Sequence, residues 1–143
     1  HILIRFEIEK ALIDGSLAIS QVPKEWNAKY QQYLGIIVPD DTRGCLQDIH
    51  WSGGMIGYFS TYALGNLVSV LLWEKINQDI PDLTDQIRQG KFDALLGWLR
   101  ENIHRHGAKF EPQELVQRVT GLKITPEPYM GYLRDKFGKV YGL

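Results

Sequence analysis

Apolar side chains recur every three or four residues along most of this chain, the spacing that brings them to one face of an α-helix. The widest apolar face lies between residues 59 and 77, so we expect this segment to be the most buried helix of the chain. That face is formed by Leu64, Leu67, Val68, Leu71 and Leu72. No segment alternates apolar and polar residues for long enough to predict a β-strand. The pattern therefore predicts a mainly α-helical protein.

Glycine and proline residues mark where the other helices end and begin. Glycine after the last apolar position favours a helix stop, and proline suits a first helical turn because its missing N–H would have no partner there. The expected stops are Gly15, Gly35, Gly90, Gly107 and Gly121, and the prolines expected in first turns are Pro23, Pro112 and Pro126. Thr125 is expected to cap the helix that starts with Pro126.

Residues 35–57 break the helical pattern. The segment contains a proline, two adjacent aspartates and several glycines, and it has no sustained period. An irregular segment of about twenty residues inside a helical domain is usually functional or flexible. Its second half also holds side chains suited to specific contacts, namely Gln47, Asp48, His50 and Trp51. We therefore predict an irregular active-site loop over residues 35–57.

A histidine in this loop is followed by two tyrosines at the start of the next helix. These residues are His50, Tyr58 and Tyr62. Histidine and tyrosine side chains that lead from a loop into a buried helix can donate hydrogen bonds to one point, which is the arrangement that stabilises an oxyanion. The alternative is that these side chains only anchor the loop, and both interpretations stay open at this point.

Two further pairs, Cys45 with His50 and Arg5 with Glu9, each have a functional and a structural interpretation. Cys45 and His50 share the loop, as a thiol nucleophile and its base would, but a single buried cysteine is the commoner case. Arg5 either pairs with Glu9 one helical turn later or points into a cleft, where it would bind a carboxylate.

No complete metal or carboxylate-pair motif is present. A helical zinc site of the H-E-x-x-H kind needs two histidines four residues apart, and this sequence contains none. His104 and His106 are two residues apart, so they project about 200° apart around a helix and suit a helix end, where positive charge is favoured. Glu7 and Glu9 diverge for the same reason. We expect no metal to be bound by this chain alone.

Composition and charge narrow the class of protein. The net charge is −1, without the basic excess of a typical nucleic-acid-binding protein, and the longest apolar stretch is far shorter than the roughly 18 residues that cross a bilayer. A single cysteine forms no internal disulfide. We expect a cytoplasmic protein with no nucleic-acid or membrane partner. Because helical sequence already runs at His1, without methionine or a cap, we expect residues 1–143 to be a single helical C-terminal domain or fragment of a longer protein.

Four blocks of sequence together resemble the thermostable (Taq-type) zinc carboxypeptidases. They are IRFEIEKALIDG at 4–15, GCLQDIHW at 44–51, GYFSTYALGN at 57–66 and the ending YLRDKFGKVYGL. The second block fits a G-x-x-Q-D-x-H-W pattern, and the four occur in the family's order over the whole chain. One departure is Ser60, where the family usually has proline.

The resemblance implies a helical fold with an elongated substrate groove, peptide substrates and a homodimer. It also implies a zinc ion held by the two histidines of H-E-x-x-H and a downstream glutamate, with the glutamate of the motif as general base. Those elements lie upstream of the block that begins at Ile4. The chain therefore resembles the helical C-terminal half of such a metallopeptidase, without its metal site, and we expect it to be inactive without the missing N-terminal portion.

The resemblance also suggests roles for individual residues. By analogy with helical zinc peptidases of the angiotensin-converting-enzyme kind, His50 and Tyr58 would donate hydrogen bonds to the oxyanion. Arg5 is the weaker candidate for binding the free C-terminal carboxylate of the substrate. The remaining residues expected on the groove are Gln47, Asp48, Trp51 and Tyr62.

Two alternatives to an active carboxypeptidase remain at this point. In the first, the chain is a complete, non-catalytic helical module whose loop binds a partner. In the second, it belongs to a degenerate metallopeptidase paralogue that keeps the groove and has lost the metal ligands. Nothing in the 143 residues separates the second alternative from the active enzyme.

Overall fold

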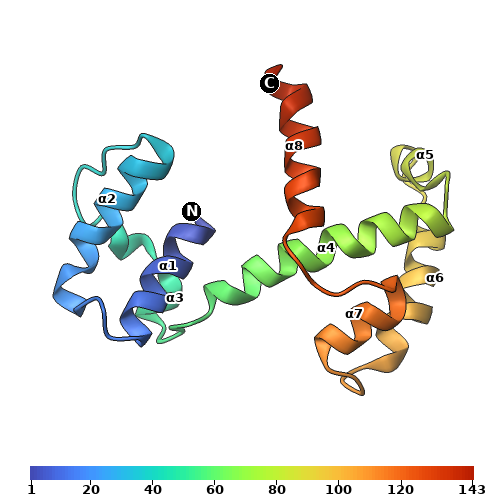
Figure 1. Cartoon of the computed structure of the whole chain (residues 1–143), viewed down its shortest axis with the longest axis horizontal. Coiled ribbons are helices and arrows are strands. Elements are labelled where there is room, and N and C mark those ends of the chain that lie inside the picture. The colour runs from blue at the N-terminus through green and yellow to red at the C-terminus, as the bar shows by residue number, and fades with distance from the viewer. The chain divides into compact units, whose positions relative to one another are not determined.

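The computed structural model describes all 143 residues, and every regular element in it is helical (Figure 1). The α-helices are α1 (Ile2–Ile13), α2 (Val22–Leu34), α3 (Ile49–Ser52), α4 (Phe59–Asp79), α5 (Leu83–Arg88), α6 (Asp93–Asn102), α7 (Pro112–Thr120) and α8 (Glu127–Tyr141). Short 3-10 turns lie at Ile19–Gln21, Cys45–Gln47 and His104–His106. The prediction of a mainly α-helical protein is confirmed.

The chain divides into two compact units, His1–Leu64 and Gly65–Leu143. Helices α1 to α3 belong to the first unit, and α5 to α8 belong to the second. Helix α4 begins in the first unit and continues into the second. All the candidate catalytic and substrate-binding residues, from Arg5 to Tyr62, lie in the first unit.

The glycine and proline signals locate most helix ends correctly. Gly35 and Gly121 follow α2 and α7 with φ of 67° and 77°, a left-handed conformation that a residue without a side chain adopts at little cost. Pro23 and Pro112 lie in the first turns of the same two helices. Helix α8 begins one residue later than expected, because Pro126 itself occupies the capping position predicted for Thr125.

The core of the first unit is small and lies between α1, α2 and the following segment. Its buried members are Ile4 and Ile8 of α1, Trp26 of α2 and Cys45. Trp51 of α3 packs against this cluster from the side. The core therefore fixes α1 against the part of the chain that carries the candidate residues.

Helix α4 is less buried than the sequence predicts. It buries four of its 21 residues, whereas α1 buries three of twelve. Of the predicted apolar face only Leu71 is fully buried, and Leu64 is 51% exposed. The expectation that α4 is the most buried helix is wrong, because most of its predicted apolar face stays partly or largely exposed and a larger share of α1 is buried. No helix of the structure is both long enough and apolar enough to cross a membrane.

Candidate functional site

Asp48 organises the second half of the segment predicted to be irregular. Its Oδ1 accepts hydrogen bonds from the backbone N–H groups of His50 and Trp51, both at 2.9 Å, so it caps the N-terminus of α3. The prediction of an irregular loop throughout 35–57 is therefore wrong over Cys45–Gln47 and Ile49–Ser52, which are helical. The preference of aspartate for helix N-termini is the sequence signal, at Asp48, that could have predicted α3.

The other oxygen of Asp48 binds Arg5 of α1. Arg5 Nε lies 2.5 Å from Asp48 Oδ2, and the two side chains are 13% and 1% exposed. The same guanidinium donates to the Tyr30 hydroxyl at 3.0 Å and lies over the Trp26 ring. The alternative of an ion pair between Arg5 and Glu9 is wrong, because the guanidinium reaches across to the carboxylate of Asp48.

This pairing changes the acidity of Asp48. Burial alone raises the pKa of the carboxyl, but the hydrogen bonds from Trp51 N and Arg5, together with the charge of Arg5, outweigh it and lower the pKa below its usual value. The carboxylate is thus ionised at neutral pH. It joins α1 to the start of α3 through a buried ion pair.

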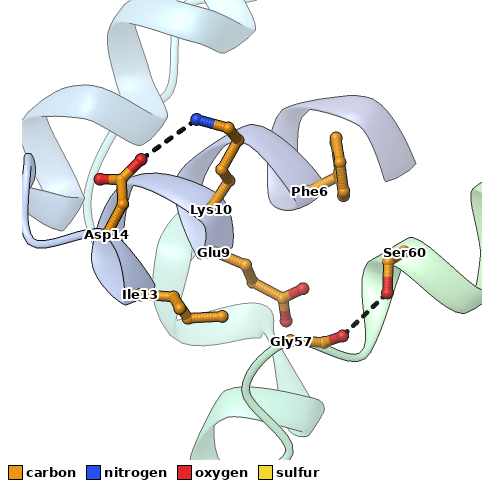
Figure 2. A pocket seen from close by; sticks show the side chains of 7 residues that line it. All are labelled: Phe6, Glu9, Lys10, Ile13, Asp14, Gly57 and Ser60. Atoms are coloured by element: carbon orange, nitrogen blue, oxygen red, sulfur yellow. Dashed lines mark hydrogen bonds and ion pairs between the residues drawn. The ribbon is translucent and has the colours of Figure 1, made fainter.

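Glu9, one turn after Arg5, makes a second buried connection that the sequence analysis missed. It is 1% exposed, and its carboxylate accepts hydrogen bonds from Trp51 Nε1 at 3.0 Å and from the backbone N–H of Phe59 at 2.9 Å. Tyr58 N also donates to it, at 3.3 Å. In Figure 2 the Glu9 carboxylate points from α1 toward Gly57, just before α4.

The sequence does carry one signal for Glu9, because it lies four residues after Arg5 and so shares a face of α1 with it. Glu7 faces elsewhere, as its two-residue spacing predicts. The Lys29 ammonium, 2.6 Å from Glu7 Oε2, lowers the pKa of Glu7, and the Tyr33 hydroxyl donates to the same carboxylate.

The histidine and the two tyrosines come together, as expected. His50 Nε2 lies 3.4 Å from the Tyr62 hydroxyl, and the rings of His50 and Tyr58 stack with centroids 5.4 Å apart. The Tyr58 and Tyr62 rings meet edge to face, also at 5.4 Å, and both residues are 41% exposed. His50 Nδ1 faces Asp48 Oδ1 at 3.5 Å without a hydrogen bond. The cluster offers three polar groups on one partly exposed surface.

Trp51 and Gln47, the other residues expected on the groove, have internal partners. The Trp51 ring packs edge-on against Trp26 and Phe59, and its N–H is taken by Glu9. The exposed Gln47 side chain donates to the carbonyl of Thr42 and so holds the segment before α3. Both residues shape the backbone around the cluster.

Gly44, which begins the G-x-x-Q-D-x-H-W block, lies where the chain packs against itself. A Cβ atom at this position would be 2.7 Å from Val38 Cγ1 and 3.0 Å from the carbonyl oxygen of Asp40. Only glycine fits such a close approach without moving its neighbours. The glycine lets the preceding loop fold back onto the segment that leads to Asp48.

The structure does not favour Cys45 as a nucleophile. The residue is 8% exposed in the core, and burial raises the pKa of its thiol, so the thiolate is scarce at neutral pH. His104 and His106 lie in a 3-10 turn that ends at Gly107, the helix-end position expected for them.

The residues present do not fit a metal ion. No three histidine, cysteine, aspartate or glutamate side chains come together as ligands in the 143 residues. The nearest approach of such groups in the cluster, Asp48 and His50, is a pair in which the carboxylate is already taken by Arg5 and two backbone groups. A metal in the complete enzyme would therefore need ligands outside residues 1–143.

The comparisons with known proteins bear on the whole chain. The model of the Carboxypeptidase Taq (M32) metallopeptidase family matches residues 1–137. The chain belongs to this family. The resemblance carried by the four sequence blocks is thereby confirmed.

Relatives in the M32 family are similar over almost the full chain. Thermostable carboxypeptidase 1 of Thermus thermophilus is 40% identical over 142 residues, which is 99% of this chain and 28% of the relative. Carboxypeptidase 1 of Bacillus subtilis is 38% identical over 141 residues, again 99% of this chain and 28% of the relative. The chain thus spans little more than a quarter of the length of these curated relatives.

Solved M32 structures share the fold. The M32 carboxypeptidase of Deinococcus radiodurans R1 superposes with a TM-score of 0.90 at 41% identity, covering 100% of this chain and 29% of that one. Metallocarboxypeptidase 1 of Trypanosoma cruzi gives a TM-score of 0.87 at 39% identity, covering 94% and 29%. The chain is therefore a helical portion of the M32 metallocarboxypeptidase fold.

Proposed function

We propose that this chain is the C-terminal portion of a zinc metallocarboxypeptidase that releases the C-terminal residue of peptides. Family membership over residues 1–137 supports the reaction class. The observation that carries the proposal is the meeting of His50, Tyr58 and Tyr62 on one partly exposed surface. Residues outside 1–143 would hold the zinc ion, whose chemistry there would be to activate a water molecule.

The role of His50 and Tyr58 is to stabilise charge on the substrate. When water adds to the scissile carbonyl, its oxygen becomes an oxyanion that needs hydrogen-bond donors. The His50 side chain is 21% exposed and Tyr58 is 41% exposed, so both can reach a substrate, and each contributes about 2–4 kcal/mol of transition-state stabilisation. The adjacent Tyr62 hydroxyl, 3.4 Å from His50 Nε2, orients the imidazole or contacts the substrate beside it.

Substrate binding by Arg5 is limited by the partners it already has. Its Nε is taken by Asp48 and its Nη1 by Tyr30 and His1, so the N–H groups of Nη2 are what it offers to the C-terminal carboxylate of a peptide. Asp48, only 1% exposed, acts by fixing Arg5 and α3. Gln47 and Asp48 shape the closed end of the groove that the family resemblance implies, through the backbone groups that they bind.

We also propose a homodimer, which the family resemblance supports, and a cytoplasmic location, which rests on the composition. Light scattering of the longest natural polypeptide that contains these residues measures the assembly directly. A mass of twice the polypeptide supports the dimer, and a monomer at micromolar concentration contradicts it.

The experiment that tests the proposed reaction is the release of a free C-terminal amino acid from an N-blocked peptide. The longest natural polypeptide that contains residues 1–143 is assayed with and without a chelator, and the 143-residue chain is assayed with added zinc. Release by the longer form alone, abolished by the chelator, is the expected result. Release by the short chain overturns the assignment of the metal to other residues. No release by either contradicts the proposed activity.

A further inference from the structure

One buried carboxylate connects the two elements that carry the candidate catalytic side chains. Glu9 of α1 accepts a hydrogen bond from the Trp51 indole, the residue next to His50 on α3. The same carboxylate accepts hydrogen bonds from the backbone N–H groups of Tyr58 and Phe59, where α4 begins. The hydrogen bond between His50 Nε2 and the Tyr62 hydroxyl, at 3.4 Å, also joins α3 to α4, and the Glu9 carboxylate is the buried link between them.

The chemistry of this position requires a carboxylate. The first N–H groups of a helix have no partner within the helix, and the N-terminus of the 21-residue α4 carries partial positive charge. Three N–H donors point at Glu9, and an ionised carboxylate is the side chain that accepts from all of them and donates to none. An amide in its place would direct N–H groups at some of those donors. The charge of Glu9 is thus matched to its surroundings.

We propose that Glu9 is a positioning residue for the oxyanion site, a role that rests on the proposed function. By holding Trp51 and the start of α4 at one point, it sets the distance between His50 and the two tyrosines. The hydrogen bonds of Glu9 go to Trp51 Nε1 and to the backbone N–H groups of Tyr58 and Phe59, so none of them reaches the ring of His50 or Tyr58. Glu9 therefore acts on the positions of the two rings indirectly, through the backbone of Tyr58 and through Trp51, the residue next to His50.

The test compares Glu9→Gln with Glu7→Gln in the longest natural polypeptide that contains this chain. Glu7 is the matched control because it lies on the same helix, loses the same charge and faces Lys29 away from the cluster. In Glu9→Gln we expect kcat to fall about 10- to 100-fold, the scale of an ångström-sized misplacement, with KM within about twofold. In Glu7→Gln both constants stay within about twofold.

A structural readout that does not depend on activity accompanies the kinetics. Hydrogen–deuterium exchange by mass spectrometry reports on the segment 57–62, which contains the two N–H groups that Glu9 binds. We expect faster exchange there in Glu9→Gln and no change in Glu7→Gln. Unchanged exchange in a folded Glu9→Gln protein overturns the positioning role.

The kinetic outcomes separate this inference from the proposed function. If the unsubstituted polypeptide releases amino acids and Glu9→Gln matches Glu7→Gln in kcat, the inference is wrong and the function stands. If the unsubstituted polypeptide releases none, the function is wrong, and the catalytic role of Glu9 with it. If Glu9→Gln does not fold, Trp51→Phe removes one of the three donors and leaves a smaller aromatic ring in its place; kcat equal to that of the parent then overturns the inference.

Discussion

Removing the carboxylate of Asp48 tests how the first unit holds its candidate site. In Asp48→Ala, two backbone N–H groups of α3 lose their acceptor and the Arg5 guanidinium loses its partner. In Asp48→Asn, an amide oxygen still accepts from α3, but the amide offers no charge to Arg5. The pair of variants separates the capping bonds from the ion pair.

The expected cost follows from the burial of the pair. The Arg5 and Asp48 side chains are 13% and 1% exposed, and removing one partner of a buried pair costs about 3–5 kcal/mol because the other charge is left unpaired. Arg5 keeps its bond to Tyr30 and its place over Trp26, so the lower end, about 3 kcal/mol, applies to Asp48→Asn. Loss of the cap adds about 1 kcal/mol in Asp48→Ala.

Denaturant unfolding followed by tryptophan fluorescence measures these differences. Asp40→Ala is the matched control, because Asp40 pairs with Arg43 on the surface, where the two side chains are 43% and 69% exposed. An exposed pair of this kind contributes at most about 1 kcal/mol. A free energy of unfolding for Asp48→Asn that equals that of Asp40→Ala refutes the reasoning.

The dependence on pH gives the same prediction a second check. The pKa of Asp48 is lowered in the folded protein, so its ionised form stabilises the fold at every pH above the unfolded value of about 3.9. That contribution is lost as the pH falls through the lower, folded pKa. The difference in free energy of unfolding between the parent and Asp48→Asn should stay constant from about pH 5 to 7. It should become smaller in more acidic solution. A difference in free energy of unfolding that grows toward low pH contradicts a lowered pKa for Asp48.

Three further predictions concern other residues of the first unit. Gly44→Ala should lower the free energy of unfolding by about 1–3 kcal/mol, because its Cβ would lie 2.7 Å from Val38 Cγ1; an unchanged denaturation midpoint argues against the close approach. Cys45 should react slowly with iodoacetamide in the folded chain and rapidly in urea, because burial raises the pKa of the thiol, and equal rates would show it accessible. Hydrogen bonds from Ser16 and Lys10 lower the pKa of Asp14 to about 2, which NMR titration of its carboxyl carbon measures; a midpoint near 4 contradicts those bonds.

The helices were predictable from the sequence because their signals are local. Pro23 and Gly35 bound α2, and Pro112 and Gly121 bound α7, through backbone preferences that act within one turn. The α3 helix was missed because four residues are too few to show the helical repeat of apolar positions, although Asp48 is a typical capping residue. Sequence patterns thus predict a helix well where it is long, or where proline and glycine mark its two ends.

The site was only partly predictable for a different physical reason. His50, Tyr58 and Tyr62 were found because they lie close together in sequence around one loop. The partners of Arg5 and Glu9 are more than forty residues away, at Asp48 and Trp51, and no spacing rule connects them. Their roles depend on tertiary packing, which places α1 against the segment that follows α2.

The measurement that tests the central claim most directly is the kcat of Tyr58→Phe in the longest natural polypeptide that contains this chain. The substitution removes one hydroxyl and keeps the ring that stacks on His50. Tyr33→Phe on α2 removes a hydroxyl that binds Glu7 away from the cluster and serves as the control. The account predicts that Tyr58→Phe lowers kcat by about 10²- to 10³-fold with unchanged metal content, whereas Tyr33→Phe leaves kcat unchanged. Equal kcat in the parent and Tyr58→Phe would contradict the role of this tyrosine in stabilising the oxyanion.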